Sequence, residues 1–120
     1  MRKPMRRLKS HTIGIDEGSI VLFSDFEDGG QMWTGSGARE LRKQVKFSEI
    51  FESSPSVRVS LSMWDMDQKT NARADISAED VTVSGFMIVF RTWGDTRVAR
   101  VRADWQAIGQ LPHEDDWQLY

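Results

Sequence analysis

Apolar and polar residues alternate most regularly between Val81 and Gly109. One run contains Phe86, Ile88 and Phe90. In a second run one face carries Val101, Ala103, Trp105 and Ala107, and the other carries Arg100, Arg102, Asp104 and Gln106. Alternation with one polar face is typical of antiparallel strands that expose one side to solvent. Gly94-Asp95 lies between the runs, where a tight hairpin turn is expected. Val81 and Val83 predict an earlier strand, which Gly85 interrupts.

The same pattern occurs in weaker form along the rest of the chain. Residues 57–63 predict a clear strand, with Val57, Val59, Leu61 and Met63 on one side. A strand pair is expected over residues 11–22, with a turn at Asp16-Glu17-Gly18. Residues from Arg39 have the propensity of a helix start, and a strand is expected from about Gln44. A short strand is expected over 72–77, followed by a turn over 78–80. Six to eight short strands at this spacing are typical of a β-sandwich.

Two segments are predicted as loops. Residues 24–37 are polar and glycine-rich, with Phe26 and Trp33 embedded, and the loop is long enough to suggest a functional role. The pattern does not decide whether Trp33 faces a ligand or the core. Residues 65–71 form the second predicted loop.

Composition narrows the class of protein. The chain has 120 residues, 39% of them apolar and 28% charged, which is typical of one soluble globular domain. A net charge of -2 does not favour a strongly charged partner. The absence of cysteine excludes disulfides and cysteine metal sites. We expect neither a secretory signal nor membrane insertion, since no apolar run is long enough, and the compartment stays open.

The expected organisation is a basic arm over residues 1–10, a β-sandwich over 11–109 and a tail over 110–120. The arm has five basic residues and reads as a solvated segment or as one that contacts an anionic surface or nucleic acid. Nucleic acid is not expected, because the arm has no aromatic residue for base stacking. Trp117, Leu119 and Tyr120 could pack on the body or on a neighbouring subunit.

The sequence offers little support for catalysis. Both histidines, His11 and His113, lie near the termini, outside the strongly patterned elements. The carboxylate pairs Asp65/Asp67 and Asp115/Asp116 could suggest calcium, but the segment DMDQKTN lacks the glycine and distal glutamate of an EF-hand loop. There is no phosphate-binding loop or dinucleotide motif. We therefore expect no enzyme, no metal and no cofactor.

Sugar binding has more support. Aromatic faces and planar polar groups on loops are what a saccharide requires. Such groups occur at Trp93, Gly94 and Asp95 on the predicted hairpin tip, at Arg73, and at Trp33, Ser36 and Gly37 in the glycine-rich loop. Structural alternatives stay open for each: Trp93 could cover the core edge, Gly94-Asp95 could serve turn geometry alone, and Arg73 could pair with a carboxylate. Trp105 is expected in the core.

The order and spacing of several segments resemble the H-type lectin domain, the fold of snail agglutinins and of the C-terminal domain of discoidins. The matching residues, within about 10–109, are Arg39-Glu40-Leu41, Val45-Lys46-Phe47, Pro55-Ser56-Val57, Asn71-Ala72-Arg73, Val81-Thr82, Gly85-Phe86, Thr92-Trp93 and Trp105-Gln106-Ala107-Ile108. The resemblance implies a six-stranded antiparallel β-sandwich that forms trimers, sometimes hexamers. It also implies galactose or N-acetylgalactosamine binding in shallow sites near subunit junctions, with several sites engaged at once.

By position, the resemblance puts the sugar-contacting arginine at Arg73 and the tryptophan at Trp93. The chain departs from the family pattern at three places: Ser36 stands near the family's loop acid, Gly94 at a histidine and Ala99 at a tyrosine. The missing acid could come from Asp25, Asp28 or Asp95. The absence of cysteines fits a bacterial or phage-borne member better than a secreted animal one.

The sequence thus predicts a non-catalytic lectin that binds glycans as a homo-trimer or hexamer. The predicted sugar-binding residues are Arg73, Trp93, Gly94, Asp95, Ser36 and Gly37. The row of Arg97, Arg100 and Arg102 alternating with Asp104 is either a solvated face or a set of contacts around a three-fold axis. The alternative function is a structural or adhesion module with a degenerate sugar site, such as a trimeric appendage of a phage-like particle.

Overall fold

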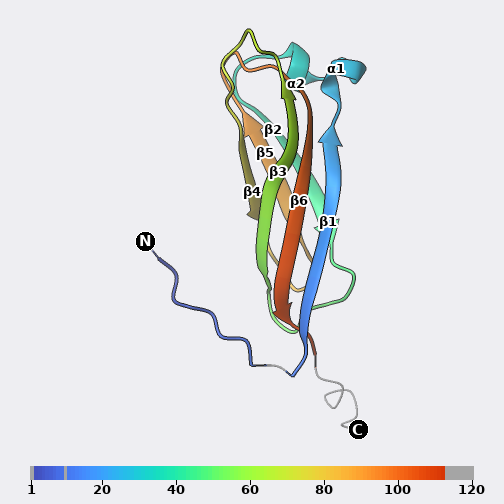
Figure 1. The fold of residues 1–120 in the computed structure, drawn as a ribbon, viewed down its shortest axis with the longest axis vertical. Helices are drawn as coiled ribbons and strands as arrows, with labels where there is room; N and C mark the ends of the chain where they lie inside the picture. The colour runs from blue at the N-terminus through green and yellow to red at the C-terminus, as the bar shows by residue number, and fades with distance from the viewer. Residues whose placement is uncertain (1, 10, 113–120) are drawn as a thin grey trace.

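Two three-stranded antiparallel sheets face each other in the computed structural model, which describes residues 2–9 and 11–112 (Figure 1). One sheet has the order β1-β6-β3 and the other the order β2-β5-β4. The strands are β1 (Ile13–Phe23), β2 (Arg39–Lys46), β3 (Ser56–Met66), β4 (Asp75–Glu79), β5 (Gly85–Thr92) and β6 (Val98–Gln110), and two four-residue helices, α1 (Asp25–Asp28) and α2 (Gln31–Thr34), follow β1. This architecture confirms the predicted six-stranded all-β sandwich.

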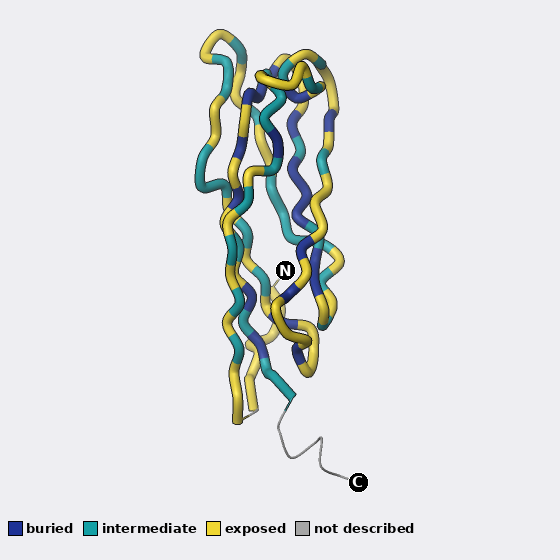
Figure 2. Tube along the Cα trace, turned by 90° about the vertical axis from the view of Figure 1, so that its right-hand side faces the viewer, coloured by how far each residue is buried: buried dark blue, intermediate teal, exposed yellow. Residues whose placement is uncertain are grey.

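The core lies between the two sheets. Phe86, Ile88 and Phe90 of β5 and the small residues Ala103 and Ala107 of β6 are almost fully buried, as their alternation predicted. Large side chains on one sheet and small ones on the other let the two sheets interdigitate. Buried and exposed residues alternate along the strands in Figure 2.

Aromatic rings fill one end of this core. Phe47, Phe51, Phe86 and Trp105 make ring contacts with centroids 5.0 to 6.0 Å apart. Trp105 is only partly buried but packs against this cluster, in agreement with its predicted core position. Each such pair stabilises the fold beyond its area burial, by roughly 0.5–1.5 kcal/mol.

The predicted turn at Asp16-Glu17-Gly18 is wrong, because β1 is one continuous strand paired with β6. Gly18 lies opposite Trp105, and a Cβ atom at Gly18 would be 2.7 Å from the indole nitrogen. The glycine therefore makes room for an aromatic side chain. Asp16 does not serve a turn either, because its carboxylate accepts hydrogen bonds from the backbone N–H (2.7 Å) and the hydroxyl (3.0 Å) of Ser48.

The predicted helix start at Arg39 is also wrong. β2 is extended from Arg39 and pairs with β5 along its whole length, so the strand begins five residues before Gln44. Arg39 and Val45 both face inward and are buried. Local helix propensity in RELRKQ is overridden here by sheet pairing and by burial of alternate residues.

The segment before β5 also differs from the prediction. Val81 and Val83 lie outside any strand, and the strand begins at Gly85 instead of being interrupted there. The hydroxyl of Thr82 accepts hydrogen bonds from the backbone N–H groups of Ser84 and Gly85 and so closes a turn. A Cβ atom at Gly85 would collide with the Val45 carbonyl oxygen, so close strand pairing requires glycine at this position.

Gly94 and Asp95 do form a turn, but the predicted hairpin is wrong. The strands on either side of the turn belong to different sheets, so the turn carries the chain from one layer to the other. β3 continues to Met66, into the predicted 65–71 loop. β4 occupies residues 75–79, where a strand over 72–77 and a turn over 78–80 were predicted. The predicted 24–37 loop contains α1 and α2. β6 extends through Gln110.

The outer face of the β1-β6-β3 sheet carries the predicted charged row. Arg100, Arg102 and Asp104 alternate with buried residues on β6 and are exposed, whereas Arg97 lies before the strand. Several residues named in the sequence analysis lie outside the described residues: His113, Asp115, Asp116, Trp117, Leu119 and Tyr120. In the described part of the chain, no helix is long and apolar enough to cross a membrane.

Candidate functional site

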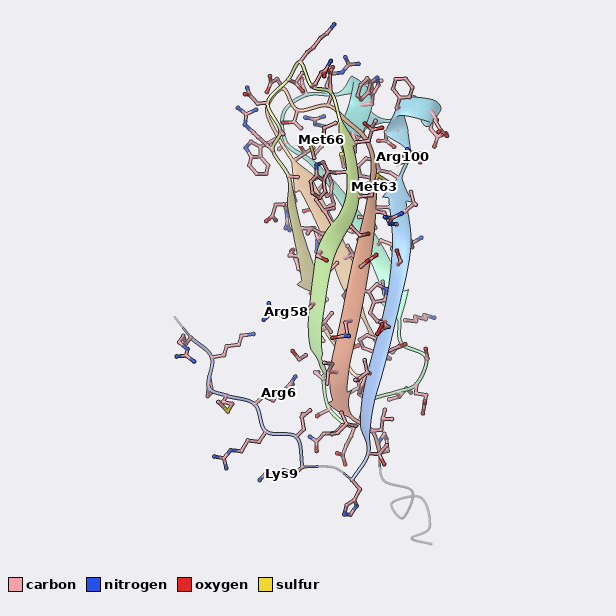
Figure 3. All side chains as sticks on the ribbon, viewed as in Figure 1. Arg6, Lys9, Arg58, Met63, Met66 and Arg100 are labelled. Atoms are coloured by element: carbon pink, nitrogen blue, oxygen red, sulfur yellow. The ribbon has the colours of Figure 1, made fainter. Side chains whose placement is uncertain are left out.

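Three connections meet at one end of the sandwich, at the top of Figure 1: the α1–α2 segment before β2, the β3–β4 loop and the β5–β6 turn. In Figure 3, Met66 and Arg100 lie toward this end. The predicted residues Ser36 and Gly37 come from the first connection, Arg73 from the second, and Trp93, Gly94 and Asp95 from the third. We call this end of the sandwich the loop end.

Arg73 and Asp95 form an ion pair at the loop end. The Nη1 atom of Arg73 lies 2.6 Å from Oδ1 of Asp95. Asn71 supports the carboxylate through its backbone N–H and its side-chain amide, each 3.4 Å away. The hydrogen bond from Arg73, followed by the backbone hydrogen bond from Asn71, lowers the pKa of Asp95. Both side chains stay partly accessible, with 35% of Arg73 and 53% of Asp95 exposed.

Gly94 fits beneath this ion pair because it has no side chain. Its φ of +70° lies in the left-handed region, which favours glycine. A Cβ atom at Gly94 would also lie 2.9 Å from Nη1 of Arg73. Any other residue would therefore strain the backbone and displace the arginine. The space that a side chain would take at Gly94 is filled by the Arg73 guanidinium.

Two buried threonines fix the backbone that carries Arg73. The hydroxyl of Thr96 accepts a hydrogen bond from the Arg73 N–H at 3.1 Å and donates one to the Asn71 carbonyl. The hydroxyl of Thr92 donates to the Arg73 carbonyl at 2.6 Å. Both residues are at most 1% exposed, so these bonds are shielded from water. The β3–β4 loop is therefore tied to both sides of the β5–β6 turn.

Arg39 joins the α1–α2 segment to the β5–β6 turn. It is only 6% exposed, and its guanidinium donates to four carbonyl oxygens, those of Gly37 (2.9 Å), Gln31 (3.3 Å), Met32 (3.2 Å) and Gly94 (3.3 Å). The Gly37 N–H also donates to the Gly94 carbonyl at 2.9 Å. Sequence reasoning missed this role of Arg39, because its spacing alone looks like that of any strand residue.

Trp33 is a structural residue. The guanidinium carbon of Arg97 lies 4.1 Å from the centre of its ring, and Phe26 packs edge-on with centroids 5.0 Å apart. Arg97 also donates to the Trp33 carbonyl at 2.9 Å and pairs with Asp67 at 3.3 Å. These contacts hold α2 against the β3–β4 loop. Trp33 is half-buried and lies in neither core cluster, and the cation–π contact occupies its ring.

The remaining candidates differ in their surroundings. Trp93, next to Gly94, is 44% exposed, and Ser36 is exposed beside Gly37. Asp25 is engaged inside the α1–α2 segment, where its carboxylate accepts a hydrogen bond from the Met32 N–H at 2.9 Å. Asp28 is exposed on α1. Of the three candidate acids, Asp95 is therefore the one that the fold pairs with Arg73.

Ala99 lines a different feature, a depression of about 130 Å³ on the loop end. Ser24, Phe26, Glu27, Asp65 and Arg100 complete its lining. No group of three or more metal-binding side chains occurs within residues 2–9 and 11–112. The loop end is thus an arrangement of hydrogen-bonding groups and exposed aromatic surface.

Residues 42–108 match the family model of the H-type lectin domain. The chain is 61% identical over 108 residues to "ATP synthase subunits region ORF 7" of Fuscovulum blasticum, covering 90% of this chain and 94% of that protein. It is 37% identical over 75 residues to a discoidin-1 chain of Dictyostelium discoideum, covering 62% of this chain but only 30% of that protein.

Solved structures agree on the fold. Discoidin II of Dictyostelium discoideum superposes with a TM-score of 0.71 at 23% identity, over 88% of this chain and 40% of that one. The tailspike protein gp49 from Pseudomonas phage LKA1 superposes with a TM-score of 0.51 at 15% identity, over 84% of this chain and 15% of that one. At these identities the likeness concerns the fold alone.

Proposed function

The chain belongs to the H-type lectin domain family, and from this premise we propose that it is a non-catalytic lectin that binds glycans through Arg73, Asp95 and Trp93 at the loop end. A relative in Fuscovulum blasticum agrees with the expectation of a bacterial or phage-borne member. Family membership and the discoidin-like fold support carbohydrate binding. The choice of residues rests on the ion pair between Arg73 and Asp95 and on the exposure of Trp93, which directly precedes the turn.

The ion pair supplies both kinds of group that a sugar hydroxyl needs. The guanidinium of Arg73 only donates hydrogen bonds, and the ionised carboxylate of Asp95 only accepts them. Two neighbouring hydroxyls can therefore bind one to each group. Charge-assisted bonds of this kind are about twice as strong as neutral ones. An aspartate is ionised at neutral pH, and the lowered pKa of Asp95 extends its role as an acceptor to more acidic solutions.

Trp93 adds the apolar surface. Trp93 is 44% exposed and directly precedes Gly94 in the chain. An aromatic ring with an exposed face can stack on the C–H surface of a saccharide. Galactose and N-acetylgalactosamine have such a surface, and we propose a sugar of this type or a related one. Ser36 and Gly37 complete the site from the α2–β2 connection.

Asp95 takes the place of the acid that the family pattern has near Ser36. Its carboxylate is 2.6 Å from Arg73 and half exposed, whereas Asp25 is engaged by the α2 backbone. The carboxylate and the arginine thus come from adjacent loops held together by Thr96. The acid comes from the β5–β6 turn and not from the loop near Ser36. Together with Gly94, this supports a monosaccharide preference that differs from that of the family pattern, with the sugar still bound by an arginine, an acid and a tryptophan.

We further propose that the chain assembles as a trimer or hexamer through the outer face of the β1-β6-β3 sheet. Ile15 and Val21 on β1 are 62% and 49% exposed there, at opposite ends of a polar centre. Asp104 lies in that centre, with its pKa lowered by hydrogen bonds from Ser19 and Ser62. A subunit contact would cover the exposed apolar side chains of Ile15 and Val21, and the hydrogen bonds to Asp104 satisfy part of the polar centre between them. Several shallow sites on one oligomer would bind a glycan surface with avidity.

The second candidate is a structural or adhesion module of a phage-like particle. A domain of this fold forms part of a phage tailspike, and the histidine and tyrosine of the family pattern are replaced here by Gly94 and Ala99. In this case the sandwich and its assembly would be kept without sugar binding.

A glycan array with the purified, untagged protein distinguishes the two. Binding to terminal galactose or N-acetylgalactosamine that is lost in Arg73→Ala supports the lectin. The matched control is Arg42→Ala, because Arg42 also makes an exposed ion pair, with Glu79 at 3.3 Å, but on the β2-β5-β4 sheet. Equal binding by both variants contradicts the site. No binding to any glycan by the wild-type oligomer favours the structural module.

A further inference from the structure

The segment from Arg2 to Lys9 lies outside the two sheets and runs back beside the sandwich, where Lys3 to Arg6 border a hollow shared with residues 54–58, Ala78 and Val81. All eight of its residues are exposed, and in Figure 1 the segment leaves the body at the end opposite the loop end. Two hydrogen bonds tie it to the body: the Arg6 guanidinium donates to the Ser54 carbonyl, and the Lys9 N–H donates to the Gln110 side chain at 3.1 Å. Figure 3 labels Arg6 and Lys9 on this segment, clear of the sheets. We call it the arm.

The basic side chains of the arm have no acidic partner among the residues that the structure describes. None of the eight ion pairs there involves Arg2, Lys3, Arg6, Arg7 or Lys9. In the body, four arginines are paired with carboxylates, namely Arg42, Arg73, Arg91 and Arg97, whereas exposed lysines such as Lys43 and Lys46 have no ion pair in the described part of the chain. The arm cations are therefore available for an anionic partner outside the chain.

Charge is also segregated along the sequence. Residues 1–10 contain five basic and no acidic side chains, while the whole chain carries -2, so the other residues carry -7. An anionic surface would attract the arm and repel the body. The arm joins the body at the end opposite the loop end, so such a partner would leave the loop end unoccupied.

Apolar residues between the cations indicate which anionic partner fits. Met5 is 88% exposed and Leu8 is 39% exposed, and each is adjacent to basic residues. At the surface of an anionic bilayer, basic side chains bind lipid phosphates while apolar ones enter the headgroup layer. A nucleic acid backbone offers no place for Met5 and Leu8, and the arm has no aromatic residue to stack on bases.

We propose that the arm is a peripheral membrane-binding segment that recognises anionic phospholipid headgroups. This inference does not depend on the sugar site, because the arm leaves the body at the other end of the sandwich. The loop end takes no part in the arm, so it can contact glycans while the arm is on a membrane. Each basic residue near such a surface contributes about a five-fold gain in affinity.

Vesicle sedimentation with the full chain tests the proposal. Vesicles of phosphatidylcholine alone are compared with vesicles that also contain phosphatidylglycerol, neither carrying any sugar. We expect binding to the anionic vesicles only, and weaker binding as the salt concentration rises, because salt screens exposed charges. Equal binding to both kinds of vesicle, or to neither, would overturn the proposal.

A charge-matched pair of variants locates the effect. Arg2→Glu with Arg7→Glu alters two exposed arm residues outside the sandwich, so the core and the sheets are left as they are. Losing two cations should weaken binding roughly twenty-five-fold or more. The control is Lys43→Glu with Lys46→Glu, which makes the same change of net charge on exposed positions of β2. A control that loses as much binding as the arm variant contradicts a role specific to the arm.

Competition identifies the chemical class of the partner. A DNA duplex without lipid is added to the vesicle mixture at equal phosphate concentration. Continued sedimentation with the vesicles supports the membrane assignment. Displacement of the protein by the duplex would overturn it in favour of nucleic acid.

Discussion

Replacing Gly94 by alanine tests the ion pair at the loop end through its geometry. The residue has a φ of +70°, where alanine is strained by about 1 kcal/mol. The new methyl group would also lie 2.9 Å from Nη1 of Arg73. That nitrogen is at the end of a flexible side chain, so it can move away at little further cost. We therefore expect a modest loss of stability and a displaced arginine.

Gly29→Ala is the matched control. Gly29 has nearly the same φ, +69°, but no atom lies within 4 Å of its Cβ position. Both variants should lose about 1 kcal/mol of stability, which lowers Tm by roughly 3–6 °C in a domain of this size. Only Gly94→Ala should disturb Arg73. The two effects of the substitution, backbone strain and displacement of the arginine, are thereby separated.

The Asp95 carboxyl reports the displacement without any ligand. Its pKa is lowered chiefly by the hydrogen bond from Arg73. A pH titration of the carboxyl carbon by NMR should show the pKa rising toward its ordinary value in Gly94→Ala and staying low in Gly29→Ala. Glycan binding should fall in the same variant. An unchanged Asp95 titration in Gly94→Ala would refute the reasoning that Gly94 makes room for the arginine.

Three further predictions concern the loop end and the assembly. The pKa of Asp95 is lowered on folding, so its carboxylate stabilises the fold above its unfolded pKa of about 3.9. This contribution is lost as the pH falls through the lower pKa of the folded state. The drop in Tm between pH 6 and pH 3 should therefore be smaller in Asp95→Asn than in the wild type. Arg39→Lys cannot reach all four carbonyls and should cost about 2 kcal/mol in urea unfolding, since buried acceptors lose their donor. Ile15→Glu, on the outer face of the β1-β6-β3 sheet, should shift the sedimenting species toward the monomer. The control Ile50→Glu should not, because Ile50 is 63% exposed but lies outside that sheet. A wild-type protein that sediments as a monomer at micromolar concentration would contradict the proposed oligomer.

The β-sandwich could be predicted because its strands bury alternate residues. In β5 and β6 the inward positions are apolar and the outward ones of β6 are charged, so periodicity alone identifies them. The pattern fails where one residue type serves two purposes. Gly18 looks like a turn residue but makes room for Trp105, and Gly85 looks like a break but allows close pairing with β2. A glycine marks a missing side chain, and only the fold shows what occupies the space.

The candidate site was predictable in its members but not in its connections. Arg73, Gly94 and Asp95 were chosen as separate loop residues, and the fold brings them into contact across 22 positions of sequence. The groups that hold them there, Thr96 and Arg39, gave no signal, because a buried threonine hydroxyl and a buried guanidinium are recognised only by the carbonyls they contact. Such anchors depend on pairs of residues distant in sequence, and residue periodicity carries no information about those pairs. The same reasoning explains Trp33, which resembles a ligand-binding aromatic in the sequence yet is held by Arg97 in the fold. A loop residue is therefore a credible ligand contact only after its neighbours in the fold have been accounted for, and Arg73, which pairs with Asp95, has to meet the same condition as Trp33, which is held by Arg97.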